Sequence, residues 1–262
     1  MSLKFSVNLC FMFHDTPSLK EKYKLAKDAG FKAVESSIYP GTTIKDMVEA
    51  KRGADVEQIL LNVYTGDISK GDVGFAAIPG QEENFKKSID TTIEYAKALN
   101  CKQIHVLSGI VIKPTSANDD VYEKNLLYAV EKFKKEGIVA LIEPICNADV
   151  PNYYLNSFEK GLNIVKKINS PYLKILIDVF HLQQICGNLT KNIKELMPYT
   201  GHVQIGQVPD RNEPDTPGEI DYKYVLSVLE REGYKGYVSL EYYPKSSPTK
   251  GLSWLQKYGY KL

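Results

Sequence analysis

The sequence predicts a single domain, residues 1–262, folded as a closed (β/α)8 barrel of the TIM type. Short apolar or β-branched runs alternate eight times with longer segments in which apolar residues recur at helical spacing. The length of 262 residues suits eight such units, and no shift in composition or linker divides the chain. The sequence also lacks the glycine-rich phosphate-binding motif expected of an open nucleotide-binding sheet.

The expected elements follow one another in strict alternation. We place strands at residues 5–10, 33–35, 56–63, 103–107, 139–142, 173–177, 202–205 and 237–240. The clearest helices are expected at 19–29, 84–99, 122–135, 156–168 and 222–230. Two longer stretches without a pattern, 64–80 and 207–220, each follow a strand. Both should therefore overhang the C-terminal end of the barrel, where barrel enzymes carry their active sites.

The composition excludes several classes of protein. Basic and acidic residues number 33 and 32, so there is no excess positive charge for a nucleic-acid backbone, and we expect a small-molecule substrate. Four widely spaced cysteines are typical of free thiols in a reducing compartment. No apolar run approaches a membrane span, and we expect a cytoplasmic protein that is free to form a homo-oligomer.

Three of the expected strands are followed directly by an acidic residue, namely Glu143, Asp178 and Glu241. A carboxylate at the end of a buried strand loses hydration free energy unless it is paired, protonated or bound to a cation. Any one of the three could instead cap a helix or meet a lysine. Because they occupy matching positions on parallel strands, the pattern favours a shared cation.

The seventh strand contributes two more polar side chains. His202 and Gln204 are two residues apart and therefore share one face of the strand. If that face is the barrel interior, the carbonyl oxygen of Gln204 joins the carboxylates. Four oxygen ligands from Glu143, Asp178, Gln204 and Glu241 favour Mn²⁺ or Mg²⁺ over Zn²⁺, and Mn²⁺ is the first choice.

Two basic side chains are candidates for substrate binding. His181 follows the sixth strand and either donates a hydrogen bond to a substrate oxygen or lies at the surface where a helix starts. Arg211 lies in the second long stretch, and its planar guanidinium suits a substrate carboxylate. The alternative is an ion pair of Arg211 with Glu213 or Asp215 that stiffens the loop. By contrast, we expect His105 to be a core histidine.

Eight short motifs along the chain carry a family resemblance. They are NLCFMF at 8–13, GFKAVE at 30–35, LIEPI at 141–145, DVFH at 178–181, GHVQI at 201–205, VPDRNEPDT at 208–216, GEIDY at 218–222 and GLSWL at 251–255. In this order they resemble the hydroxypyruvate isomerase family of xylose-isomerase-like barrels over nearly the whole chain. Related ketose 3-epimerases carry His at the position of Gln204, which separates this chain from them. The chain departs from the isomerase pattern at Val73, where an arginine is usual.

The resemblance implies one metal held by Glu143, Asp178, Gln204 and Glu241, with the two glutamates also transferring protons. In an aldose–ketose isomerisation one glutamate takes a proton from the substrate and the pair returns it to the neighbouring carbon. The metal and His181 then stabilise the enediolate between these steps. The reaction implied is the interconversion of hydroxypyruvate and tartronate semialdehyde.

Three alternatives remain at this point. One is an isomerase or epimerase of another small oxo acid or ketose, such as 2-oxo-tetronate. Another is a barrel that binds metal and ligand without turnover. The third is a metal-dependent nuclease on the related abasic-site endonuclease barrel, which would need several histidines at the strand ends and a basic face. The sequence disfavours this last alternative.

Overall fold

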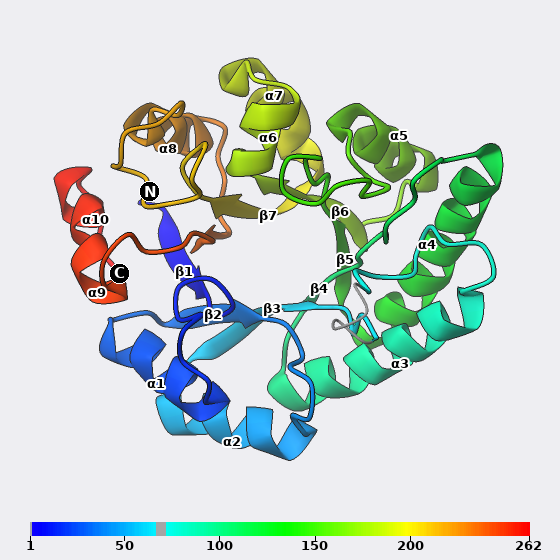
Figure 1. Ribbon diagram of the computed structural model, residues 1–262, viewed down its shortest axis with the longest axis horizontal. Helices are drawn as coiled ribbons and strands as arrows, with labels where there is room; N and C mark the ends of the chain where they lie inside the picture. The colour runs from blue at the N-terminus through cyan, green and yellow to red at the C-terminus, as the bar shows by residue number, and fades with distance from the viewer. Residues whose placement is uncertain (1, 67–71) are drawn as a thin grey trace.

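In the computed structural model, which describes residues 2–66 and 72–262, eight parallel strands close into a barrel (Figure 1). The neighbours in the barrel are also neighbours in sequence, and β8 returns to pair with β1 through Val7 and Leu240. The strands are β1 Lys4–Asn8, β2 Ala33–Ser36, β3 Glu57–Asn62, β4 Gln103–His105, β5 Val139–Ile142, β6 Leu173–Asp178, β7 Thr200–Ile205 and β8 Tyr237–Leu240. The predicted fold class and all eight predicted strands are confirmed.

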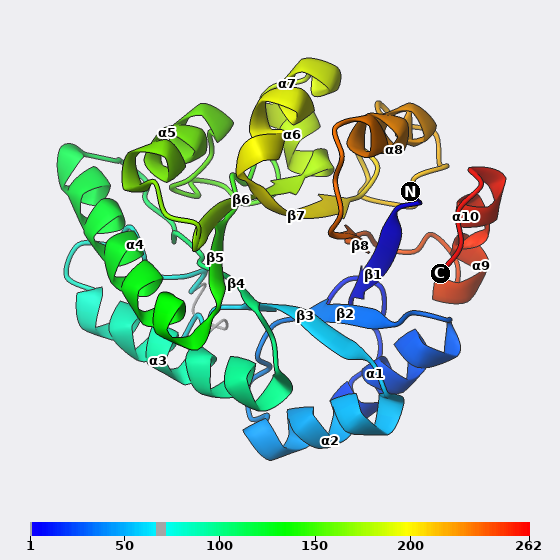
Figure 2. The same cartoon turned by 180° about the vertical axis from the view of Figure 1, so that it is seen from behind.

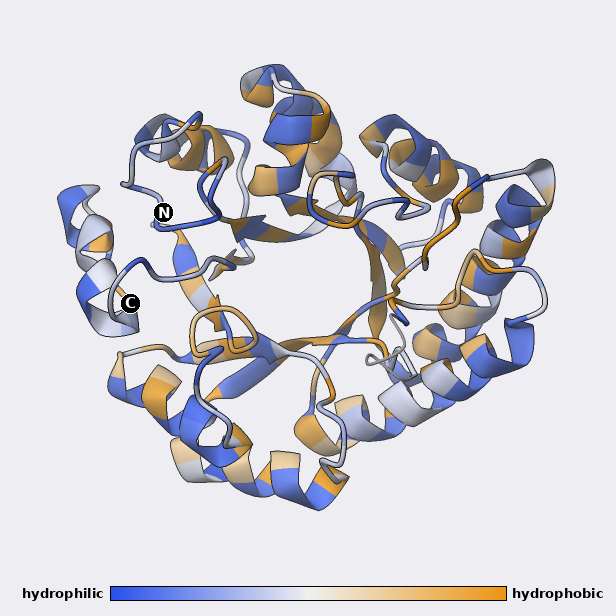
Figure 3. Cartoon of the chain, in the orientation of Figure 1, coloured by the Kyte–Doolittle hydropathy of each residue, from blue (hydrophilic) through white to orange (hydrophobic). Residues whose placement is uncertain are grey.

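Helices surround the barrel, as Figures 1 and 2 show from its two ends. They are α1 Leu19–Asp28, α2 Ile44–Ala54, α3 Glu82–Leu99, α4 Ser116–Glu136, α5 Phe158–Ile168, α6 Val179–Ile185, α7 Leu189–Leu196, α8 Tyr222–Arg231, α9 Pro248–Gly251 and α10 Ser253–Lys257, with a 3-10 turn at Met197–Tyr199. The long helices in Figure 3 carry both hydrophobic and hydrophilic residues, as expected of helices with one buried face. No helix in the described ranges is both long and apolar enough to cross a membrane.

The observed boundaries differ from the expected ones for local reasons. The first strand ends at Asn8, because the Asn8 side chain accepts a hydrogen bond from the Cys10 backbone N–H at 2.8 Å and turns the chain there. Helix α2 was not among the clearest expected helices, yet it has a capping box in which the side chains of Thr43 and Asp46 each bond the other's backbone N–H. The expected loop at 64–80 is described only outside residues 67–71.

Candidate functional site

The interior of the barrel has an apolar layer below a polar layer. Ala33, Leu141 and Leu176 belong to one small buried cluster within the barrel wall. Because side chains alternate along a strand, the residues two positions further along, Glu35, Glu143 and Asp178, lie on the same face but nearer the C-terminal ends. All three are buried. The strand pattern therefore brings acidic groups to the end of the barrel where the long loops lie.

Two of the four predicted metal ligands, Glu143 and Asp178, come together at this end with His181, whereas Glu241 is not part of that close group. Oxygen and nitrogen atoms of Glu143, Asp178 and His181 lie within 4.8 Å of one another, an arrangement able to hold a metal ion. Gln204 is the register partner of Asp178 on the neighbouring strand. Glu241 follows β8 and shares a contact with Asp178, since one guanidinium nitrogen bonds both carboxylates. The residues that the sequence selected thus occupy one region.

That guanidinium belongs to Arg211, which is almost fully buried among carboxylates. Its Nη2 donates to Asp178 Oδ2 at 2.6 Å and to Glu241 Oε1 at 3.2 Å, and its Nη1 donates to Asp149 Oδ2 at 2.7 Å. The rings of Phe11 and Phe180 each lie 4.6 Å from the guanidinium carbon, and such cation–π contacts fix its plane. Arg211 therefore reaches the acidic centre from its loop.

The alternative role for Arg211, an ion pair with Glu213 or Asp215, is wrong. Glu213 accepts hydrogen bonds from the Lys245 backbone N–H, and Asp215 pairs with Lys257. Both acids lie only a few residues beyond Arg211 in the sequence, but their side chains bond other partners.

The loop that carries Arg211 is organised by Gln207, a residue that the sequence analysis did not select. The buried side chain of Gln207 accepts from the backbone N–H groups of Val208 and Ile220, both at 3.0 Å. Its amide nitrogen donates to the Ile220 carbonyl oxygen at 2.9 Å. One amide thus ties the beginning of the loop to its end. At Gly206 an added Cβ would lie 2.9 Å from the Glu241 carbonyl oxygen, so only glycine allows this close approach.

His181 lies in the first turn of α6 and is buried, so its expected surface alternative is also wrong. Its Nδ1 lies 3.4 Å from the Cys146 backbone N–H, which can only donate. The ring proton therefore resides on Nε2, which lies 3.5 Å from Asp178 Oδ2 and 3.7 Å from Glu143 Oε1. Burial, with the nearby Arg211 charge, lowers the pKa of His181 well below its usual value. His181 is thus a neutral hydrogen-bond donor.

His105 was expected in the core, and it is buried, but it faces the same acidic centre. Its Nδ1 lies 3.2 Å from Asn62 Oδ1 and 3.6 Å from Glu143 Oε2. Burial lowers the pKa of His105 to about 4, so the ring is neutral at pH 7. The sequence signal was available, because His105 ends β4 as Asp178 ends β6.

The buried carboxylates of Glu143, Asp178 and Glu241 lie close together, and they outnumber the positive charges beside them. Burial raises the pKa of Glu143 and of Glu241 well above the usual value, and neighbouring carboxylates add to the rise. Burial also raises the pKa of Asp178 to about 6, although Arg211 opposes the shift. A further cation in the cluster would therefore stabilise these carboxylates in their ionised form.

The donor set passes a simple test for a cation site. Among the described residues, Glu143 Oε1, Gln204 Oε1 and Glu241 Oε2 are buried and have no hydrogen-bond partner. Buried oxygens without partners are rare, because each loses its hydration without compensation. A divalent ion bound by these oxygens and by Asp178 would compensate for that loss. The residues therefore fit a divalent cation that accepts oxygen ligands.

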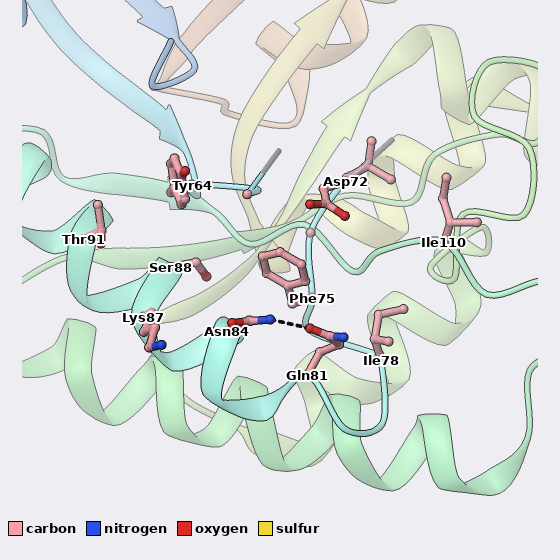
Figure 4. Close-up of a pocket in the computed structure, with 13 residues that line it drawn as sticks. Tyr64, Asp72, Phe75, Ile78, Gln81, Asn84, Lys87, Ser88, Thr91 and Ile110 are labelled. Carbon is pink, nitrogen blue, oxygen red and sulfur yellow. Dashed lines mark hydrogen bonds between the residues drawn. The ribbon is translucent and has the colours of Figure 1, made fainter. Parts of the chain in front are cut away.

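A second feature of the same barrel end is a cavity of about 690 Å³ beside α3. Figure 4 shows Tyr64, Phe75, Asn84 and Ile110 around it, with Asn84 bonded to Gln81. None of the described residues that line it belongs to the acidic centre. We therefore locate the candidate functional site at the acidic centre and not at this cavity.

The chain is similar to known proteins along nearly its full length. A family model described as "Xylose isomerase-like TIM barrel" matches residues 23–258. A Danio rerio protein named "Putative hydroxypyruvate isomerase" is 40% identical, with 98% of this chain and 95% of that protein covered. A Haemophilus influenzae protein named 2-oxo-tetronate isomerase is 39% identical, with 97% and 99% covered. A Brucella melitensis crystal structure described as AP endonuclease, family 2, is 35% identical with a TM-score of 0.93, and the match covers 98% of this chain and 99% of that one.

Proposed function

The chain belongs to the hydroxypyruvate isomerase family of xylose isomerase-like TIM barrels, and from this premise we propose that it interconverts hydroxypyruvate and tartronate semialdehyde. The reaction moves one proton from C3 to C2 and the hydroxyl proton from O3 to O2. The observation that carries the proposal is the pair of buried glutamates, Glu143 and Glu241, each with one carboxylate oxygen that has no partner.

Glu143 and Glu241 are suited to proton transfer because they follow different strands of one barrel wall. Burial raises the pKa of each above the usual range of a glutamate, which makes each a stronger base than an exposed carboxylate. One glutamate takes the proton from the substrate carbon and the other delivers a proton to the neighbouring carbon. By microscopic reversibility the base of the forward reaction is the acid of the reverse reaction.

Glu143, Asp178, Gln204 and Glu241 would hold a divalent ion, which when bound supplies Lewis-acid stabilisation of the negative charge on the substrate oxygens. His181 presents its Nε2–H toward the same region and can donate to a substrate oxygen as charge develops there. Arg211, which is in cation–π contact with Phe11 and Phe180, offers its guanidinium to the substrate carboxylate.

A closely related activity is supported by the second named relative. A 2-oxo-tetronate substrate keeps the carboxylate and the adjacent reacting carbons but is one carbon longer, and the same acid, base and guanidinium would serve it. A nuclease is disfavoured, because the net charge of +1 offers little attraction for a nucleic-acid backbone.

The proposal is tested with purified, Mn²⁺-loaded protein in D₂O. Hydroxypyruvate and 2-oxo-tetronate are supplied separately, and NMR follows product and the exchange of the substrate carbon-bound proton with solvent. An isomerase would be supported if the wild type turns over either acid and the Glu143→Gln, Glu241→Gln double variant does not. A protein that binds Mn²⁺ and both acids yet exchanges no proton would instead be a binding barrel.

A further inference from the structure

Glu35 is a fully buried acid that the proposed reaction does not use. It lies on β2 inside the barrel, and three donors surround its carboxylate. Oε1 accepts from Gln204 Nε2 at 2.7 Å and from Asn8 Nδ2 at 2.9 Å, and Oε2 lies 2.7 Å from His202 Nε2. These contacts give both carboxylate oxygens hydrogen-bond partners inside the barrel.

The orientations of the Asn8 and Gln204 side-chain amides follow from their hydrogen-bond partners. The other end of the Asn8 amide, Oδ1, accepts from the Cys10 backbone N–H, so Nδ2 must face Glu35. An oxygen that accepts from Asn8 presents a lone pair to Gln204 as well. The Gln204 amide must therefore place its nitrogen toward Glu35, and its oxygen away from it.

That oxygen is the important atom. Gln204 Oε1 is buried without a partner, beside Asp178 on the neighbouring strand. If the amide were reversed, an NH₂ group would face the acidic centre and would repel a cation. We propose that Glu35 is a positioning residue, which holds Gln204 so that its oxygen, and not its nitrogen, faces the divalent ion. This inference rests on the proposed function, because it concerns the metal site of that reaction.

The experiment measures the Kd for Mn²⁺ by titration calorimetry, without substrate. The variants are Glu35→Gln, Gln204→Leu and the combination of both. Outer partners of metal ligands typically contribute 10- to 100-fold to affinity, so Glu35→Gln should weaken Mn²⁺ binding by about that factor. If Glu35 acts through Gln204, the combined variant should bind Mn²⁺ no more weakly than Gln204→Leu alone.

Two controls separate positioning from general damage. Gln58→Leu removes another buried amide, which bonds Tyr23 and Ser36, and should lower thermal stability while leaving the Kd unchanged. Glu35→Asp keeps the negative charge but shortens the side chain, and it also replaces Glu35→Gln if that variant does not fold. It should weaken Mn²⁺ binding, because orientation and not charge alone is required.

The outcomes are distinguishable. A wild-type Kd in Glu35→Asp or Glu35→Gln, or losses that multiply in the combined variant, would overturn the positioning role and leave the isomerase proposal standing. A wild-type protein that binds no Mn²⁺ would overturn both proposals. The expected pattern of Kd values in a protein that does not turn over hydroxypyruvate would support the role of Glu35 and refute the activity.

Discussion

Replacing Arg211 by methionine should destabilise the metal-free protein strongly, and Mn²⁺ should recover much of that loss. Arg211 is the cation that contacts Asp149, Asp178 and Glu241, and its side chain is 6% exposed. Removing one member of a buried ion pair typically costs about 3–5 kcal/mol, because the remaining charge has no partner. For a chain of this length that corresponds to a fall in Tm of about 6–20 °C.

The recovery follows from the same charges. A divalent ion at the cluster supplies positive charge to Asp178 and Glu241, and it does so more effectively when the guanidinium is absent. Saturating Mn²⁺ at 100 times its Kd adds about 2.7 kcal/mol to any protein that binds it only when folded. The Mn²⁺-induced rise in Tm should therefore be at least as large in Arg211→Met as in the wild type.

Thermal unfolding with EDTA and with Mn²⁺ measures both quantities. Arg231→Met is the matched control, since Arg231 is exposed on α8 and its loss should change stability by less than about 0.5 kcal/mol. The reasoning would be refuted by an Arg211→Met protein that is as stable as the control in EDTA. A loss of stability that Mn²⁺ does not reduce would show that the ion binds elsewhere.

Four further predictions concern the same site. Glu143→Gln and Glu241→Gln should each abolish most turnover and keep the fold, measured as kcat with circular dichroism as the check; near-normal kcat would remove that residue from the mechanism. Arg211→Lys should cost about 1.5–3 kcal/mol of transition-state stabilisation for an oxo acid, calculated from the fall in kcat/KM, and much less for an uncharged ketose. Equal losses for the two substrates would show that Arg211 does not bind the substrate carboxylate. In the metal-free protein Glu143 and Glu241 should each contribute a loss of stability as pH rises above the ordinary pKa of a glutamate, because their raised pKa values make the folded state bind more protons than the unfolded state there. In urea unfolding, the free energy of unfolding should therefore fall less with rising pH in Glu143→Gln than in the wild type, and an equal pH dependence would contradict this. Gln207→Leu should lower the free energy of unfolding by about 1–3 kcal/mol, since it leaves buried backbone groups of the loop unpaired. It should also raise KM. Unchanged stability would show that the loop does not depend on this amide.

The strand ends could be predicted from sequence because burial and alternation are local properties. Glu143, Asp178 and Glu241 each follow an apolar run, and parallel strands must end on the same side of a barrel. The same reasoning placed His202 and Gln204 on one face, and the structure confirms it, since both contact Glu35. No local pattern, however, marked Glu35 as their partner, because the contact joins residues 167 and 169 positions apart.

The partners of Arg211 could not be predicted for a related reason. Sequence neighbours suggested Glu213 and Asp215, but Arg211, whose backbone has a left-handed φ of 53°, bonds Asp149, Asp178 and Glu241 instead. Glu213 and Asp215 bond Lys245 and Lys257. Helix α2 is a different case, since Thr43 and Asp46 three residues later are a capping-box signal that is readable in the sequence itself. Propensity and caps are readable locally, whereas the direction of a loop side chain depends on the whole fold.

The charge of the proposed substrate and the need for a cation are linked. Asp149, Asp178 and Glu241 contact one guanidinium, Glu143 lies near enough to interact with its charge, and Glu35 has its own partner in His202. An oxo acid brings another negative charge into this excess, and at short range in a buried site like charges repel by several kcal/mol. A divalent ion offsets that repulsion, and Arg211 can then exchange a protein carboxylate for the substrate carboxylate without a net loss of ion pairs. Binding of an oxo acid should therefore depend on Mn²⁺ more steeply than binding of an uncharged ketose of the same size.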